Sequence, residues 1–282
     1  MTSKVGAYSY KLLLQDCLKG MQEISSNNID IVVTSPPYNL GIAYGHYKDS
    51  CDRFQYLNWC KKWTREIKRI LKKNGSFFLN IGASPSNPML PYEIVILMSE
   101  FFVLQNTFHW IKSITVKTPD GVETSVGHFK PINSKRYVTD CHEYVFHFTH
   151  TGNTPLDRLS LGVPYSDKSN ISRWSHTSNQ DKRCRGNNWF VPYKTIKSRV
   201  IDRPHPATFP IKLAENCIRL HGVKKNTIVL DPFVGIGHAP LGAIRCGVKK
   251  FIGFDINPEY LKIAKEKIKP FDSNYQESTK ST

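Results

Sequence analysis

The chain has 282 residues and a mass of 32.3 kDa, which corresponds to one large domain or to one domain with an insert. Its 39 Lys and Arg side chains against 23 Asp and Glu give a net charge of +16 at pH 7. Such an excess favours a polyanionic partner, nucleic acid before an anionic membrane. Hydrophobic residues make up 40% of the chain, enough for a core, so wholesale disorder is excluded.

The apolar segments are short. No run of about 18 apolar residues occurs, so no transmembrane helix is expected, and the N-terminus lacks the pattern of a signal peptide. Seven cysteines are scattered without a C-x-x-C pair, which indicates free thiols in a reducing cytoplasm. The histidines around residues 142–150 are expected to have core or surface roles, and no metal site is predicted.

Apolar periodicity predicts an alternation of strands and helices along most of the chain. Strands are expected at residues 29–34, 76–81, 107–116, 143–149, 227–230 and 251–254, and helices at 54–71, 91–102, 210–221, 239–246 and 258–268. Asn74-Gly75 is expected to end the first of these helices. This alternation predicts an α/β fold with a mainly parallel sheet and helices on both faces.

One segment differs from its surroundings. Residues 150–204 carry 10 basic and four acidic side chains, are rich in Ser, Asn, Gly and Pro, and have little periodicity. We therefore expect a basic insert here, between a first core segment at 1–149 and a second at 205–270, with a polar tail at 271–282.

Two motifs lie at the ends of predicted strands. The sequence DPFVGIG at 231–237 follows one strand and precedes a helix, and the next strand ends in Asp255. A glycine turn lets a ligand approach the backbone, and an acid at that distance suits ribose hydroxyl groups. An isolated G-x-G is compatible with an ordinary turn, but the whole strand–turn–helix–strand–Asp array is more specific.

The other motif is TSPPY at 34–38, again after an apolar strand. Two consecutive prolines are stiff and supply no N–H groups, so the Ser35 hydroxyl and the Pro36 carbonyl can be fixed as acceptors beside the ring of Tyr38. This arrangement suits the exocyclic amine of a stacked base, although a rigid turn is the plainer alternative. Because ligands of open α/β sheets bind at the carboxyl edge, both motifs are expected to be adjacent.

Together these motifs resemble the SAM-dependent amino-group DNA methyltransferases of the β group, in which the catalytic motif precedes the cofactor motif. The resemblance covers about residues 10–268 and is carried by TSPPYN at 34–39, HPATFP at 205–210, DPFVGIG at 231–237 and FIGFDIN at 251–257. It implies a Rossmann-like methyltransferase core with permuted motif order, S-adenosylmethionine (SAM) as methyl donor and no metal. The chain would act in the cytoplasm of a prokaryotic cell, at the nucleoid.

The resemblance also implies roles for individual residues. The catalytic set is Ser35, Pro36, Pro37 and Tyr38. The cofactor-binding set is Asp16, Thr34, Thr208, Asp231, Phe233, Gly235, Gly237, Asp255 and Asn257, with helix capping as the alternative for Asp16. The partner is double-stranded DNA. The charge of the insert makes Arg173, Lys182, Arg183, Arg185, Lys197 and Arg199 the candidate DNA contacts, with Trp174, Trp189 and Tyr193 among them, and a solvated basic loop is the alternative. A cognate restriction endonuclease is a further expected partner.

Ser before Pro-Pro-Tyr, and HPATFP, resemble cytosine-N4 enzymes more than adenine-N6 enzymes, so N4 methylation of a flipped cytosine is expected, with adenine-N6 methylation as the alternative. A weaker alternative is a DNA-binding protein without activity. The sequence departs from the family at Gly237-His238-Ala239-Pro240, where small hydroxyl residues usually follow the glycine loop. Polar contacts to SAM from those hydroxyls are therefore not expected here.

Overall fold

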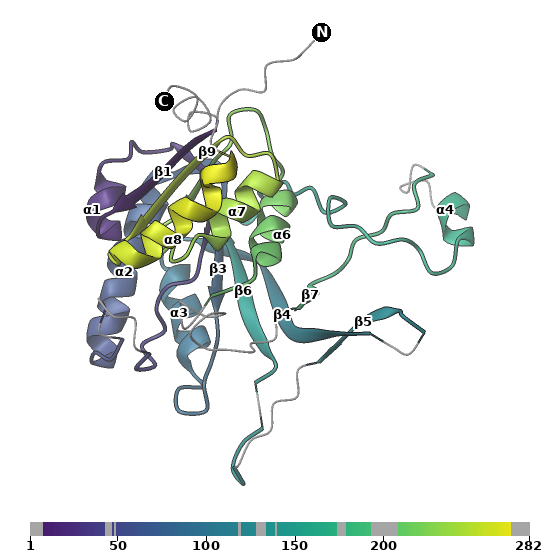
Figure 1. Cartoon of the computed structure of the whole chain (residues 1–282), viewed down its shortest axis with the longest axis horizontal. Helices are drawn as coiled ribbons and strands as arrows, with labels where there is room; N and C mark the ends of the chain where they lie inside the picture. The colour runs from purple at the N-terminus through teal and green to yellow at the C-terminus, as the bar shows by residue number, and fades with distance from the viewer. Residues whose placement is uncertain are drawn as a thin grey trace, which may run out of the picture.

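A computed structural model describes residues 8–42, 47, 49–117, 120–127, 134–138, 140–173, 179–192 and 208–271 (Figure 1). Its strands are β1 (Ser9–Leu14), β2 (Ile29–Thr34), β3 (Leu71–Ile81), β4 (Val103–Lys117), β5 (Glu123–Gly127), β6 (His142–Thr149), β7 (Asn188–Pro192), β8 (Ile228–Asp231) and β9 (Lys250–Asp255). Its helices are α1 (Cys17–Gln22), α2 (Arg53–Ile70), α3 (Leu90–Ser99), α4 (Ser169–Arg173), α6 (Ile211–His221), α7 (His238–Arg245) and α8 (Pro258–Ile268), followed by the 3₁₀ turn η2 (Lys269–Phe271).

The strands form one sheet in the order β1-β9-β8-β2-β3-β6-β4-β5, and β7 pairs with β4. All pairings from β1 to β3 are parallel, β6 is antiparallel to both β3 and β4, and β7 is parallel to β4. The predicted α/β class and mainly parallel sheet are confirmed. The first strand of the second half, β8, lies beside β2 of the first half, so the two predicted halves share one sheet.

Helices pack on both faces of this sheet, as expected. Along β2, Val32 belongs to a core cluster that includes residues of α1, α2 and α3, whereas Ile31 and Val33 belong to a second cluster with residues of α6, α7 and α8. Such alternation follows from strand geometry, because successive side chains point to opposite faces. The apolar stripe of α2, with fully buried Trp63, and that of α6 therefore cover opposite sides of the same strand.

The start of β3 differs from the prediction. Helix α2 ends at Ile70 and β3 begins at once with Leu71, so Asn74-Gly75 lies inside the strand and does not end the helix. Leu71 pairs with Ile29 while Ser76 pairs with Ile31, an irregular register that leaves the intervening residues of β3 without regular partners. The turn-forming dipeptide therefore accommodates a bulge.

The sequence pattern also failed to predict β1, α1, β5, α4 and β7. Strand β7 lies within the segment expected to be a basic insert, and it adds to the main sheet beside β4. Trp189 of β7 is 1% exposed and stacks on Phe108, with ring centroids 4.3 Å apart. The expectation that Trp189 contacts DNA is therefore wrong, because its ring is part of the core.

Residues before β7 extend away from the sheet as an arm that carries α4, at the right of Figure 1. Val163 and Arg183 pair as an isolated antiparallel bridge within this arm, and Asp181 forms an ion pair with Lys168. Nothing in the described ranges forms a helix long and apolar enough to cross a membrane. The seven cysteines all lie in described ranges, and none of them forms a disulfide.

Candidate active site

The two motifs found in the sequence meet at the carboxyl edge of the sheet. Strands β2 and β8 are parallel neighbours, with Ile31 opposite Val229 and Val32 opposite Leu230, so Thr34 and Asp231 end side by side. The Thr34 hydroxyl donates a hydrogen bond of 2.6 Å to Asp231 Oδ1, and both side chains are buried. Burial raises the pKa of Asp231 to about 7, outweighing the bonds from Thr34 and from the Phe233 amide, which favour the charged form.

The glycine loop after β8 is held by carboxylates. Asp231 Oδ1 accepts from the Phe233 amide at 3.0 Å, and Asp255 Oδ2 accepts from the Gly235 amide at 2.8 Å. Gly237 has φ +84°, and a Cβ there would lie 2.9 Å from Ala264 Cβ of α8. The loop therefore requires glycine at this position both for its backbone conformation and for its contact with α8.

The predicted acidic and amide residues lie around this loop. Strand β1 pairs with β9, with Leu14 opposite Asp255, which brings Asp16 to the same edge. Asp16 accepts from the amides of Leu18 and Lys19 and is the N-cap of α1, while Asn257 caps α8. Burial raises the pKa of Asp255, whose Oδ1 also accepts from the Asn257 amide at 2.8 Å.

Some of the predicted cofactor-binding residues have side chains that are engaged with other parts of the protein. The hydroxyl of Thr34 is committed to Asp231, and the ring of Phe233 packs against Trp59 and Trp63 at centroid distances of 5.4 and 5.7 Å. Thr208 is half-buried beside Phe209, whose carbonyl accepts a 2.7 Å bond from His238 Nδ1. His238, where the family has a small hydroxyl residue, thus ties the glycine loop to the 208–210 segment.

These residues fit a nucleoside-bearing methyl donor. The Asp255 carboxylate at the end of β9 can accept ribose hydroxyls, and the glycine loop brings backbone close to the same place. Pro240 occupies the first turn of α7, where its missing N–H leaves no helical bond unmade. The departure from the family at residues 237–240 therefore leaves the loop and the start of the helix intact.

The catalytic motif forms a polar cluster directly after β2. The Ser35 hydroxyl and the Tyr38 hydroxyl are 2.9 Å apart, and the one Tyr38 hydroxyl proton has two acceptors within reach, Glu143 Oε2 at 3.1 Å and the Asn80 carbonyl at 3.3 Å. The buried Tyr56 donates a 2.8 Å bond to the Pro37 carbonyl. The proline turn is thus fixed from α2, and the Ser35 and Tyr38 hydroxyls are fixed relative to each other.

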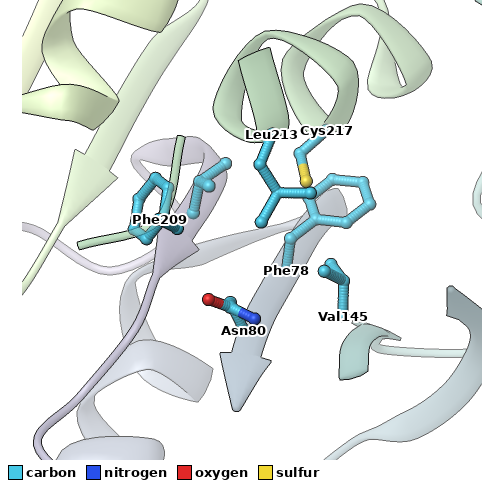
Figure 2. Close-up of a pocket in the computed structure, with 7 residues that line it drawn as sticks. Phe78, Asn80, Val145, Phe209, Leu213 and Cys217 are labelled. Carbon is cyan, nitrogen blue, oxygen red and sulfur yellow. The ribbon is translucent and has the colours of Figure 1, made fainter. Parts of the chain in front are cut away.

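A small pocket is lined in part by Val33, two positions before Ser35 (Figure 2). It is lined by Val33, Phe78, Asn80, Val145, Phe209, Leu213 and Cys217, which come from three strands, α6 and the segment before it. Figure 2 shows the Asn80 amide and the Phe209 ring facing the same space. The strand next to the catalytic motif and the 208–210 segment of the second half therefore both contribute residues to this pocket.

The predicted DNA-contacting residues lie on the arm. Arg173 ends α4, and it is exposed, as are Lys182, Arg183 and Arg185. Arg183 Nε donates to the Pro164 carbonyl at 3.3 Å and Arg185 Nε to the Leu161 carbonyl at 3.0 Å, so both side chains also brace the arm. The other two basic residues, Lys197 and Arg199, lie outside the described residues, as do Trp174 and Tyr193.

Sequence reasoning missed three polar residues at this edge, namely Asn80, Lys112 and Glu143, and it named His238 only as a departure from the family pattern, without its contact to Phe209. None of these three was part of a recognised motif, and each contacts a partner that is distant in the sequence. The position of Asn80 at the end of a predicted strand, next to the strand that ends in TSPPY, was the one available signal. Lys112 and Glu143 gave none, because strand order is not visible in a single sequence.

Comparison with known proteins assigns the family. The chain matches the DNA methylase family of N6 and N4 enzymes over residues 29–266. It is 29% identical to the Type II methyltransferase M.HpaI of Haemophilus parainfluenzae over 260 residues, covering 92% of this chain and 74% of that protein. It is 24% identical to the DNA adenine methyltransferase YhdJ of Escherichia coli over 269 residues, covering 93% and 83% of the two chains.

Solved structures share the fold. PvuII DNA methyltransferase, which is cytosine-N4-specific, superposes with a TM-score of 0.68 at 21% identity, covering 97% of this chain and 93% of that one. The protein TTHA0409 of Thermus thermophilus, solved with SAM, gives 0.61 at 22% identity, covering 94% and 95%. The resemblance seen in the motifs is thereby confirmed: this chain belongs to the N6/N4 DNA methylase family and is a SAM-dependent DNA amino-methyltransferase.

Proposed function

We propose that the chain methylates the exocyclic N4 amine of cytosine at a specific site in duplex DNA. The observation that carries this proposal is the Ser35 hydroxyl in front of Pro36-Pro37-Tyr38, held 2.9 Å from the Tyr38 hydroxyl. Serine at this position and HPATFP at 205–210 resemble cytosine-N4 enzymes. PvuII methyltransferase, which has this specificity by name, is among the proteins that share the fold.

The target amine lies inside a base pair, so the cytosine is flipped out of the duplex to reach the motif. Its ring stacks on Tyr38, and its two N–H groups donate to the Ser35 hydroxyl and the Pro36 carbonyl. An amine conjugated with a ring is a poor nucleophile because its lone pair is delocalised. Two fixed acceptors favour the tetrahedral form of the nitrogen, whose lone pair then attacks in line, so positioning and preorganised polar groups supply most of the acceleration.

The methyl group comes from SAM, whose sulfonium makes it electrophilic. The proposed cofactor residues are those assigned by resemblance, with Asp255 accepting ribose hydroxyls and Gly235 and Gly237 allowing close approach of the backbone. Thr34 and Asp231 act through their mutual hydrogen bond, because both side chains are buried. This bond fixes the end of the catalytic strand relative to the cofactor strand.

Duplex DNA is proposed to contact the basic segment at 150–204, which serves as the target-recognition region. The arm exposes Arg173, Lys182, Arg183 and Arg185 and extends away from the sheet (Figure 1). Positive side chains on an extended arm suit phosphate contacts along a duplex. A restriction endonuclease with the same recognition sequence is the proposed companion, because M.HpaI is a Type II methyltransferase.

The second candidate is adenine-N6 methylation. YhdJ is an adenine methyltransferase by name, and a serine hydroxyl can accept a hydrogen bond from either amine. The deciding experiment incubates the protein with mixed-sequence duplex DNA and SAM, digests the DNA and identifies the modified nucleoside by mass spectrometry. N4-methylcytosine supports the proposal, N6-methyladenine selects the second candidate, and no methylation by a protein that binds DNA indicates a DNA-binding protein without activity.

A further inference from the structure

Glu143 lies beside the catalytic motif although it belongs to no motif itself. Strand β6 runs antiparallel to β3, with Tyr144 opposite Ile81, so the first residues of β6 lie at the edge where β2 and β3 end. A parallel strand would have placed its last residues there. The topology therefore adds an acidic side chain, 105 positions away from Tyr38 in sequence, to the site formed by residues 35–38.

The contacts form a continuous polar chain. It runs from the Ser35 hydroxyl to the Tyr38 hydroxyl over 2.9 Å and from there to Glu143 Oε2 over 3.1 Å. Glu143 Oε1 lies 2.9 Å from Lys112 Nζ, so a positive charge balances the carboxylate at its far side. The Glu143 side chain is 15% exposed, which limits competition from water.

The direction of these hydrogen bonds follows from the chemistry of the acceptors. An ionised carboxylate and a backbone carbonyl can only accept, so the Tyr38 hydroxyl donates to Glu143 or Asn80. The Tyr38 oxygen is then an acceptor for the Ser35 hydroxyl proton. With its proton donated to Tyr38, the Ser35 oxygen has lone pairs that can accept a hydrogen bond from the target amine.

Space for the carboxylate is provided at the end of β3. A Cβ on Gly82 would lie 2.9 Å from Glu143 Cγ and 3.1 Å from its Cδ, so any larger residue at position 82 displaces this side chain. Gly82 lacks the positive φ that would require glycine for backbone reasons. Its contact with Glu143 is therefore the reason in this structure for a glycine at this position.

Building on the function proposed above, we propose that Glu143 is a positioning residue that takes up the proton released by the methylated amine, through Tyr38 and Ser35. As the amine lone pair forms the N–C bond, the S–C bonding pair remains on sulfur and the nitrogen becomes positively charged. One N–H proton then moves to Ser35 Oγ, the Ser35 proton to the Tyr38 oxygen and the Tyr38 proton to Glu143. The amine and the carboxylate both end neutral.

The first test is Glu143→Gln, with Glu100→Gln as matched control, because Glu100 is also paired with a lysine but lies at the end of α3. We expect the single-turnover rate of Glu143→Gln to fall on the order of 10²-fold, the range of general base catalysis, with unchanged affinities for SAM and DNA. The control should keep the wild-type rate. A normal rate in Glu143→Gln overturns the proposal.

Chemical rescue separates a proton acceptor from a structural residue. Glu143→Ala leaves space beside Lys112, and added formate should restore part of its rate, whereas equal chloride should not. Glu143→Gln fills that space and should not respond to formate. A Glu143→Ala rate that formate does not raise contradicts the proposal. If Glu143→Ala does not fold, the Gln variant still decides.

A double-mutant cycle tests the route through Tyr38. Tyr38→Phe keeps the aromatic face but removes the hydroxyl, so Glu143→Gln added to it should cause little further loss. Multiplicative losses would show that Glu143 acts independently of Tyr38 and would overturn the route. Ser35→Ala tests the proposed function separately: an inactive Ser35→Ala with a fully active Glu143→Gln refutes only this inference, while an active Ser35→Ala refutes the catalytic serine itself.

Discussion

Thr34 and Asp231 are 197 positions apart in sequence, yet the buried Thr34 hydroxyl donates a 2.6 Å hydrogen bond to the Asp231 carboxylate where β2 and β8 end side by side. One residue ends the strand that leads to the catalytic motif, and the other begins the cofactor loop. This bond therefore links the end of the strand that leads to the catalytic motif directly to the end of the strand that leads to the cofactor loop.

Asp231→Asn should change how stability depends on pH. Burial raises the pKa of Asp231 from 3.8 to about 7, so between these values the folded protein binds a proton that the unfolded chain has lost. The contribution of Asp231 to the free energy of unfolding is thus fully present below about pH 4 and is lost as pH rises through 7. Asn keeps an acceptor for Thr34 but does not titrate.

Chemical denaturation at half-unit steps from pH 4 to pH 8 measures this effect. The stability of Asp231→Asn relative to the wild type should rise across that window and stay constant above it. Buried His147 and His221, whose pKa values are lowered by burial to about 3 and about 4, change the slope of both proteins equally. A constant difference between the two curves would show that Asp231 does not titrate there.

Asp255→Ala should weaken SAM binding and leave DNA binding nearly unchanged. The carboxylate accepts from the Gly235 and Asn257 amides and, in the proposed complex, from ribose hydroxyls. Loss of a hydrogen bond to a charged group costs about 1.5–3 kcal/mol of binding free energy. The glycine loop also loses the Asp255 carboxylate that holds the Gly235 amide, which should weaken SAM binding further. Isothermal titration calorimetry with SAM gives the difference. Unchanged affinity in a folded variant would contradict the assignment.

Replacing Arg183 and Arg185 together should flatten the salt dependence of DNA binding. Each lost phosphate contact lowers the slope of log K against log salt by roughly 0.9. Because both side chains also donate to backbone carbonyls of the arm, Gln is the replacement, since it keeps a donor. Binding of duplex DNA is followed by fluorescence anisotropy between low and moderate salt. An unchanged slope would place the DNA on another surface.

Ser35→Ala and Tyr38→Ala should both greatly reduce methyl transfer, for different reasons. Loss of one preorganised acceptor should slow the chemical step by about 10²-fold or more while SAM and DNA affinities stay nearly constant. Loss of the Tyr38 ring removes a stacking face worth about 1–3 kcal/mol per base and should also weaken capture of the flipped nucleotide. Single-turnover kinetics at increasing DNA concentration separate a slower chemical step from weaker capture of the nucleotide. Near-normal turnover in Ser35→Ala would refute the mechanism.

Much of this site could be predicted because its chemistry is encoded locally. An apolar run followed by Ser35-Pro36-Pro37-Tyr38, and another followed by Asp231 and the glycine loop, identify both strands and their ligand-facing ends without knowledge of the fold. The rule that ligands bind at the carboxyl edge then predicted their adjacency. The observed pairing of β2 with β8 confirms it.

Other features depended on long-range pairing. Trp189 lies in a segment with the composition of a surface insert, yet the pairing of β7 with β4 buries its ring against Phe108. Asn74-Gly75, a strong helix-ending signal, lies inside β3 as part of the irregular stretch between Leu71 and Ser76, the two residues on either side that pair with β2. In both cases the pairing of a strand with its neighbours in the sheet outweighs the local preference of the sequence.

The sequence by itself determined the fold class, the family and the residues of the two motifs, because short apolar strands and the residues after them carry that information within a few positions. Only the tertiary structure decided what surrounds those residues. The antiparallel direction of β6 brings Glu143 to Tyr38, and the neighbouring β2 and β8 let Thr34 bond to Asp231. Strand order and direction are set by the packing of the whole core, which no local pattern of residues contains.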